Sequence, residues 1–355
     1  MTVRILQGDC RDVLKTLPDE SVHCVVTSPP YWGLRDYGHA GQLGLESTPG
    51  EYVEKMVAVF ADVRRVLRND GTLWLNLGDS YAGSWGNSGS RPELDGKTQN
   101  QRPKDADYLP RGGWDNRRDR PASSYKLPGI KAKDLVGIPW RVAFALQAAG
   151  WWLRQDIIWS KPNPMPESVR DRCTKAHEYL FLLAKSERYY FDAEAIQEPF
   201  AEASIARLEQ PSIEQQAGSD RVPGKTNGTM KACGPSSYRG STFTRGKTGE
   251  IKPTVGQGER VEAAGRNKRS VWTVTTQPFK EAHFATFPPA LIEPCILAGC
   301  PTGGTVLDPF GGAGTTGLVA DRHKRSAILI ELNPEYAAMA KRRIQGDSPL
   351  FAEVA

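Results

Sequence analysis

Short apolar runs alternate with segments of helical periodicity along most of the chain, and this alternation limits the fold more than any other feature. Seven runs have the length and composition of strands, at residues 3–6, 22–26, 72–77, 151–159, 178–184, 305–307 and 326–330. Apolar residues at helical spacing predict helices at 51–67, 139–149, 287–298, 315–321 and 334–344. Strands that alternate with helices favour a doubly wound, seven-stranded, largely parallel α/β sheet of the Rossmann-like type, and we expect 178–184 to pair antiparallel with 151–159.

Two long segments, 80–133 and 201–270, interrupt this pattern with Gly, Ser, Asn and basic residues and show no steady period. Residues 91–133 hold eleven Lys and Arg against six Asp and Glu, and residues 201–270 hold twelve against seven. Since the net charge of the whole chain is +5, its positive excess is concentrated in these segments. A partner that carries phosphates explains this distribution. Polar inserts that are basic by chance are the simpler alternative.

The chain also carries information about its compartment. No run approaches the roughly 18 apolar residues of a membrane helix, and the start, MTVRILQGDC, lacks the layout of a signal peptide. The six cysteines form no CxxC pair and no regular ladder of spacings. We therefore expect a soluble cytoplasmic protein with reduced thiols, and neither a metal site nor a disulfide framework.

A glycine-rich turn follows the strand at 305–307, in the sequence VLDPFGGAGTTG. The strand leads into Asp308, and a helix starts near Thr315. In such sheets ligands bind outside the carboxyl ends of strands, where glycines allow a close approach to the backbone. Gly314 stands where a phosphate-binding loop needs lysine, which disfavours nucleotide hydrolysis. Glu331, 23 residues after Asp308 at the end of the next strand, is suited to hold ribose hydroxyls.

A second unusual turn, TSPPYW, follows the apolar run at 22–26 and should reach the same crevice. Prolines restrict the backbone, so that the hydroxyl of Ser28 and the carbonyl of Pro29 can be aimed as two rigid acceptors. Two acceptors suit an exocyclic amino group with its two N–H donors. Tyr31, after Pro30, offers a face on which an extruded base can stack.

These two motifs resemble the catalytic and cofactor motifs of the amino-methylating DNA methyltransferases that use S-adenosylmethionine. Their order, with the catalytic motif first, resembles that of the β class. Four other segments also resemble family motifs: GDCRDVL (adenine recognition), IIWSKPNPMP (beside the target base), HFATFPPALIEPCI (over the cofactor methionine) and IELNPEY (ribose acid). The resemblance covers about two thirds of the chain and does not extend to the two inserts.

The resemblance implies a role for particular residues. The catalytic residues are Ser28, Pro29, Pro30 and Tyr31. The expected S-adenosylmethionine contacts are Asp9, Cys10, Ser28, His283, Phe284, Pro288, Asp308, Phe310, Gly312, Gly314, Thr315, Glu331 and Asn333. The expected contacts to DNA or to the flipped base are Trp32, Arg35, Trp159 and Lys161. The implied organisation is a catalytic half at 1–79 and 134–200 with a basic insert at 80–133, a target-recognition region at 201–270 and a cofactor-binding half at 271–355.

The implied reaction is direct in-line methyl transfer to the exocyclic N4 of a flipped cytosine in double-stranded DNA. In the family, serine at the first position of the catalytic motif accompanies cytosine N4 more often than adenine N6. An N6-adenine enzyme is the alternative, and an RNA or protein methyltransferase of the same fold is the second. A cognate restriction endonuclease or a solitary, host- or phage-encoded modification role, nucleoid association, and a monomeric or homodimeric state all fit.

Two other residues are interpreted as structural, and one further class of protein is disfavoured. Cys295 lies in ALIEPCILAG, an apolar helical pattern, so a packing thiol is favoured over a nucleophile for cytosine C5. Glu178 opens an apolar strand and is interpreted as part of a structural pair with His177. A DNA-binding protein that has lost catalysis is disfavoured by the intact Ser28, Tyr31, Asp308 and Glu331.

Overall fold

The computed structural model of the chain describes residues 1–33, 41–82, 129–131, 133–200, 265–277, 286–347 and 353–354. The chain divides into two compact units, residues 1–191 with 270–355 and residues 192–269. The described part of the second unit holds the short 3-10 helix η2 (Glu194–Ile196) and a β-bridge between Glu198 and Arg266. Most of the predicted inserts at 80–133 and 201–270 lies outside the described residues.

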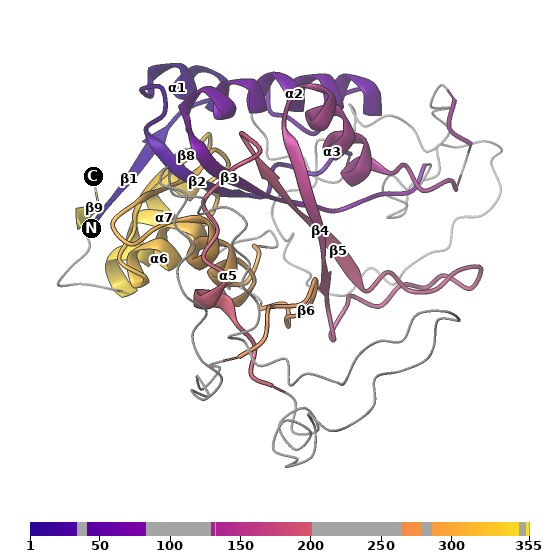
Figure 1. The fold of residues 1–355 in the computed structure, drawn as a ribbon. Coiled ribbons are helices and arrows are strands. Elements are labelled where there is room, and N and C mark those ends of the chain that lie inside the picture. The colour runs from indigo at the N-terminus through magenta and orange to yellow at the C-terminus, as the bar shows by residue number, and fades with distance from the viewer. Residues whose placement is uncertain are drawn as a thin grey trace, which may run out of the picture. The chain divides into compact units, whose positions relative to one another are not determined.

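One sheet forms the centre of the first unit, with the strand order β6-β4-β5-β3-β2-β7-β8-β1-β9 (Figure 1). Its strands are β1 (Thr2–Gln7), β2 (Val22–Thr27), β3 (Leu67–Leu77), β4 (Trp152–Ser160), β5 (His177–Ala184), β6 (Val271–Thr273), β7 (Thr305–Asp308), β8 (Ser326–Glu331) and β9 (Glu353–Val354). Strand β5 runs antiparallel to both of its neighbours, and the other pairs are parallel. The predicted doubly wound α/β sheet and its antiparallel hairpin are confirmed.

The strand count differs from the prediction. All seven predicted strands are present, and the described sheet contains two more, β6 and β9, at its two edges. These strands are three and two residues long, respectively, which is too short to produce a recognisable period-2 pattern.

Helices cover both faces of the sheet (Figure 1). Helices α1 (Cys10–Thr16), α2 (Pro49–Val66) and α3 (Ile138–Ala148) lie on one face. Helices α5 (Pro289–Gly299), α6 (Thr315–Arg322) and α7 (Pro334–Asp347) lie on the other face. Helix α1 was not predicted, because its seven residues bury only Cys10 and Leu14 and so show almost no periodicity.

The longest helix, α2, shows how the sequence specifies these elements. The Thr48 hydroxyl accepts a hydrogen bond from the backbone N–H of Glu51 at 3.2 Å, and Pro49 occupies the first turn, where its missing N–H costs nothing. Tyr52, Met56 and further residues of one face are fully or almost fully buried against the sheet and its neighbouring helices. This packing places the first turn of α2 beside the turn that follows β2.

The crevice of the fold lies between β2 and β7. These strands are parallel neighbours, with Cys24 opposite Val306 and Val25 opposite Leu307. After β2 the chain continues to α2 on one face, and after β7 it continues to α6 on the other face. The carboxyl ends of the two strands therefore form a topological switch point, where ligands bind in open α/β sheets.

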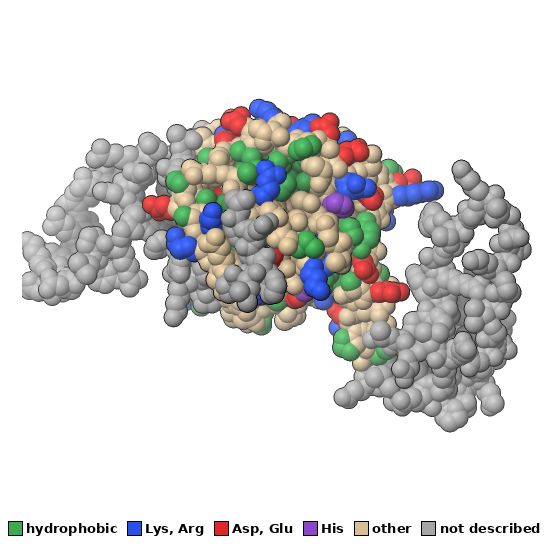
Figure 2. Space-filling view, turned by 90° about the vertical axis from the view of Figure 1, so that its left-hand side faces the viewer, with side chains coloured by type: hydrophobic (Ala, Val, Ile, Leu, Met, Phe, Trp, Pro, Cys, Tyr) green, Lys and Arg blue, Asp and Glu red, His purple; other side chains and the backbone are tan. Residues whose placement is uncertain are grey.

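The described surface carries charges of both signs. On the face drawn in Figure 2, Lys and Arg side chains are interspersed with Asp and Glu, and no patch of a single sign covers the described part of that face. None of the helices in the described ranges is long and apolar enough to span a bilayer.

Candidate active site

A buried carboxylate joins the two strand ends at the switch point. Asp308 is 1% exposed, and its two oxygens accept hydrogen bonds from the hydroxyls of Thr27 and Thr316, both at 2.7 Å. The backbone N–H of Phe310 donates a third hydrogen bond to Oδ1 at 3.0 Å. Burial away from water raises the pKa of Asp308 to about 6, although the three donors oppose this shift. Asp308 thus holds the glycine-rich turn against the end of β2.

The glycine-rich turn packs against the end of β8. The N–H of Gly311 donates to the carbonyl of Ile330 at 2.8 Å, and the N–H of Gly312, at φ +50°, donates to the Glu331 carboxylate at 2.7 Å. The N–H of Asn333 donates to the other oxygen of that carboxylate at 2.8 Å. Each Glu331 oxygen has more than one acceptor position, so the carboxylate is aimed by the backbone and still able to accept hydrogen bonds from a ligand.

The turn after β2 is anchored from the opposite side. The Tyr52 hydroxyl donates to the carbonyl of Pro30 at 2.9 Å, and the indole N–H of Trp32 donates to the carbonyl of Glu46 at 2.9 Å. No described residue donates to the carbonyl of Pro29. The turn is therefore rigid, with one of its two predicted acceptors satisfied by no other group in the described part of the chain.

Hydrogen bonds fix the polarity of the Ser28 hydroxyl. The amide nitrogen of Asn76 donates to the carbonyl of Tyr179 at 3.1 Å, which turns Asn76 Oδ1 toward Ser28 Oγ at 3.3 Å. The Tyr31 hydroxyl, at 3.5 Å, is a second acceptor for the serine proton. Because Asn76 Oδ1 can only accept and the Tyr31 hydroxyl gives its own proton to Glu178, the serine donates to one of these two oxygens and keeps its lone pairs for another donor. The Tyr31 hydroxyl, whose pKa is raised mainly by burial and further by the nearby Glu178 charge, donates to Glu178 at 2.7 Å.

An ion pair continues this network across the sheet. The ammonium of Lys161 forms a hydrogen-bonded ion pair with Glu178 and lies 4.2 Å from the centroid of the Trp159 ring. The indole N–H of Trp159 donates to the carbonyl of Val274 at 2.8 Å. The positive charge of Lys161 is thus already compensated inside the site, by a carboxylate and an aromatic face.

The turn after β2, the glycine-rich turn and the pair of Lys161 and Glu178 line one cavity of about 810 Å³. The predicted site residues that line it are Asp9, Cys10, Ser28, Pro29, Pro30, Tyr31, Trp159, Lys161, Phe310, Gly312, Thr315, Glu331 and Asn333. The cavity brings the turn after β2 and the glycine-rich turn together, although they are far apart in the sequence. Arg35, His283 and Phe284 lie outside the described residues.

Four predicted residues do not line the cavity. Trp32, a predicted base contact, is buried in the hydrophobic core, and its indole is bonded to the carbonyl of Glu46. Asp308 lies behind the glycine-rich turn with both oxygens occupied. Gly314 caps α6 at φ +76°, and a Cβ there would lie 2.8 Å from Ala340 of α7. Pro288 precedes α5 as its N-cap residue. Each of these positions shapes the fold and makes no contact with the cavity.

The two residues that start α1 have local roles. The Asp9 carboxylate caps α1 through the N–H of Arg11 at 2.9 Å and also pairs with the Arg11 guanidinium, which lowers the pKa of Asp9. Arg11 in turn donates to the carbonyl of Gly41 at 2.8 Å, which ties the segment at 41–43 to the cavity wall. Burial raises the pKa of the Cys10 thiol to about 12, so the thiol is neutral.

Sequence reasoning missed three residues of the site. Asn76 and Glu178 lie within apolar strands, and Glu178 was interpreted as a structural residue, whereas its carboxylate faces the cavity. Gly78 follows β3, and a Cβ there would lie 2.4 Å from the Tyr31 ring. The available signal was a polar residue within an apolar strand, since a buried polar group needs a partner.

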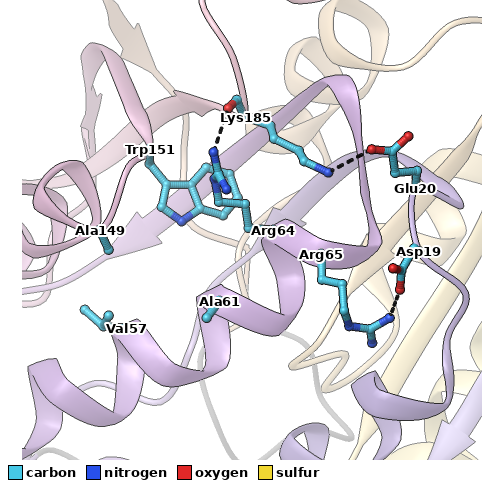
Figure 3. A pocket seen from close by; sticks show the side chains of 9 residues that line it. All are labelled: Asp19, Glu20, Val57, Ala61, Arg64, Arg65, Ala149, Trp151 and Lys185. Atoms are coloured by element: carbon cyan, nitrogen blue, oxygen red, sulfur yellow. Dashed lines mark hydrogen bonds and ion pairs between the residues drawn. The ribbon is translucent and has the colours of Figure 1, made fainter.

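A second cavity, of about 520 Å³, is lined by residues of α2 and of the loops beside it (Figure 3). Its charged side chains bind one another or a backbone carbonyl. Arg65 pairs with Asp19, Lys185 lies 3.5 Å from Glu20, and Arg64 donates to the carbonyl of Lys185 at 3.3 Å. These contacts join α2 to the neighbouring loops, and we assign the cavity a structural role. No group of three or more His, Cys, Asp or Glu suited to a metal occurs within the described ranges.

The comparison with protein families identifies the chain. The model of the DNA methylase family that groups N6 and N4 enzymes matches residues 22–342. The chain belongs to this family, so the predicted membership of the amino-methylating DNA methyltransferases is confirmed.

Three known proteins illustrate the similarity. The type II methyltransferase M.XycI of Xanthomonas campestris pv. cyanopsidis is 42% identical over 351 residues, which cover 99% of this chain and 90% of that protein. The structure of PvuII DNA methyltransferase (cytosine-N4-specific) has a TM-score of 0.55 at 18% identity and covers 96% of this chain and 87% of its own. The structure of the putative DNA modification methylase TTHA0409 from Thermus thermophilus, in complex with S-adenosyl-L-methionine, has a TM-score of 0.53 at 21% identity and covers 99% of both chains. At these identities the two structures indicate a shared fold.

Proposed function

We propose that this DNA methyltransferase transfers a methyl group from S-adenosylmethionine to the exocyclic N4 of a cytosine flipped out of double-stranded DNA. The observation that carries the proposal is the orientation of Ser28. Its proton is directed to Asn76 at 3.3 Å or to the Tyr31 hydroxyl at 3.5 Å, so its lone pairs are available to an amino group in the cavity. The glycine-rich turn lines the same cavity, so a methyl donor held there would share the cavity with that amino group.

The residues around the glycine-rich turn suit S-adenosylmethionine. Glu331, aimed by the N–H groups of Gly312 and Asn333, suits the ribose hydroxyls. Phe310 and Ile330 supply apolar walls for an adenine ring. When bound, S-adenosylmethionine supplies a methyl group on a sulfonium, which leaves as a neutral thioether.

The turn after β2 would hold and polarise the base. Ser28 Oγ and the carbonyl of Pro29 each accept one N–H of the exocyclic amine, which lets the nitrogen lone pair point out of the ring plane. The Tyr31 ring, held by its bond to Glu178 and by the close approach of Gly78, provides a rigid wall for the base. The expected contribution is mostly positioning, because no covalent enzyme intermediate is required.

The preference for cytosine rests on the serine. A hydroxyl is a neutral acceptor, and in the amino-methylating family serine at this position accompanies cytosine N4 more often than adenine N6. The type II methyltransferases among the relatives support a role in restriction–modification, with a cognate endonuclease as the expected partner.

The test is product analysis of DNA incubated with the protein and methyl-labelled S-adenosylmethionine, followed by nucleoside digestion and mass spectrometry. N4-methylcytosine is the expected product. N6-methyladenine would refute the base assignment and keep the mechanism. Absence of label in DNA, with labelled RNA or protein instead, would refute the assignment of DNA as the substrate.

A matched pair of variants tests the role of the turn. We expect Ser28→Ala to lower kcat by about 10²–10³-fold, because it removes an oriented hydrogen-bonding group, and to leave cofactor affinity unchanged. Ser21→Ala serves as the control. It also removes a serine hydroxyl, but at the start of β2 rather than at its end, where the hydroxyl donates to the carbonyl of Pro18. Equal activity of the two variants would contradict the assignment.

A further inference from the structure

The loop 161–176, which joins β4 to β5, carries an exposed methionine at the rim of the cavity. Met165 is 86% exposed, although methionine is among the residue types most often buried. It lines the same cavity as Ser28 and Tyr31. A single exposed apolar side chain is common on protein surfaces, but Met165 stands among the residues that line the cavity, where a bound molecule would meet it.

The backbone around Met165 is constrained on both sides. Pro164 and Pro166 flank it, so the backbone has few alternative conformations there. The side chain of Asn163 exchanges two hydrogen bonds with the backbone of Thr276, at 3.0 and 3.3 Å. Met165 is therefore held outward by a rigid backbone, without packing of its own side chain.

A base must leave its helix to reach Ser28. Extrusion breaks its pair and its stacking, at a cost of a few kcal/mol. It also leaves a gap in the stack that water fills poorly. Apolar side chains such as methionine can insert between base steps of unstacked DNA.

We propose that Met165 is a wedge that enters the DNA stack at the position vacated by the target base and thereby favours the extruded state. The proposal rests on the proposed DNA amino-methyltransferase activity. It assigns Met165 a positioning role, because the thioether acts on the equilibrium between stacked and extruded base and touches no reacting atom.

The experiment compares two duplexes that contain the methylation site, mapped beforehand by sequencing DNA that the wild-type enzyme has methylated. In one duplex the target base is paired normally, and in the other an abasic site stands opposite it, so that extrusion costs less. We expect Met165→Ala to lower kcat/KM on the paired duplex by about ten-fold or more, and to lower it much less on the duplex with the abasic site. Met165→Leu, which keeps an apolar chain of similar size, should retain most of the activity on both duplexes.

Each of the other outcomes would refute the proposal that Met165 acts as a wedge. An equal loss on both duplexes would mean that Met165 contacts the base or the cofactor, and no loss on either would mean that it is an ordinary surface residue. If the wild-type enzyme methylates no DNA in the product analysis, which precedes this comparison, the proposed function is refuted and the wedge with it. Phe144→Ala is the control, because Phe144 is 54% exposed on α3 and does not line the cavity.

Discussion

The buried carboxylate of Asp308 predicts an unusual dependence of stability on pH. Its pKa is about 6 in the folded chain, against an ordinary value of 3.8, because burial penalises the charged form more than its three hydrogen-bond donors favour it. Asp308→Asn keeps the size and shape of the side chain and removes the ionisation. With the amide oxygen in the place of Oδ1, Thr27 and the N–H of Phe310 still donate to it, and the Thr316 hydroxyl can rotate to accept from the amide nitrogen.

The direction and the size of the change in stability with pH follow from proton linkage. Between pH 3.8 and about 6 the folded state binds more protons at Asp308 than the unfolded state does, so this group lowers stability as pH rises through that window. A shift of about two pKa units corresponds to about 3 kcal/mol in total. From pH 5 to pH 8 the wild type should lose about 1.4 kcal/mol relative to Asp308→Asn.

The assay is urea unfolding of both proteins at several pH values between 5 and 8, read as the difference in the free energy of unfolding. Asp70→Asn is the matched control, because its side chain is 55% exposed and the substitution leaves the buried carboxylate in place. A difference between wild type and Asp308→Asn that stays constant over this range, or that changes in the opposite direction, would refute the reasoning.

Two further variants test the wall of the base site. Gly78→Ala places a Cβ 2.4 Å from Tyr31 Cε2, so the ring must move. We expect the methylation rate to fall by up to about 10²-fold, while cofactor affinity, measured by calorimetry, stays unchanged. A normal turnover rate would show that the position of the ring is unimportant. Glu178→Gln leaves Lys161 without its carboxylate, and we expect a lower kcat and a lower thermal midpoint, both partly restored by the additional Lys161→Met substitution. A double variant no better than the single one would exclude the charge as the cause.

The sequence predicts where the site lies better than it predicts which polar groups complete it. The turn after β2 and the glycine-rich turn meet because both follow the carboxyl ends of parallel strands. This rule does not predict Glu178 as a site residue, because Glu178 lies at the start of β5, which runs antiparallel to its neighbours. Its first residues, with Tyr179 opposite Leu77, therefore lie at the edge where the parallel strands end.

Side-chain direction separates the predicted residues that line the cavity from those that do not. Tyr31 and Trp32 are adjacent in sequence, yet one lines the cavity and the other enters the core, because α2 and the 41–46 segment pack behind the turn. Asp308 has the expected place at the strand end, but its side chain turns inward to the threonine hydroxyls. Neither direction can be read from spacing, since both depend on residues distant in the chain.

The hydrogen bond between Thr27 and Asp308 spans 281 residues, which has a consequence for protein synthesis. Strand β2 leaves the ribosome early and cannot pair with β7 until nearly the whole chain has been translated, because a domain assembles only when its parts have emerged. Truncated products that end before Asp308 would contain the turn after β2 without the strand that completes the crevice. In a cell, the capacity to modify DNA would therefore appear only after Asp308 has been translated, with a delay set by translation and by this long-range pairing.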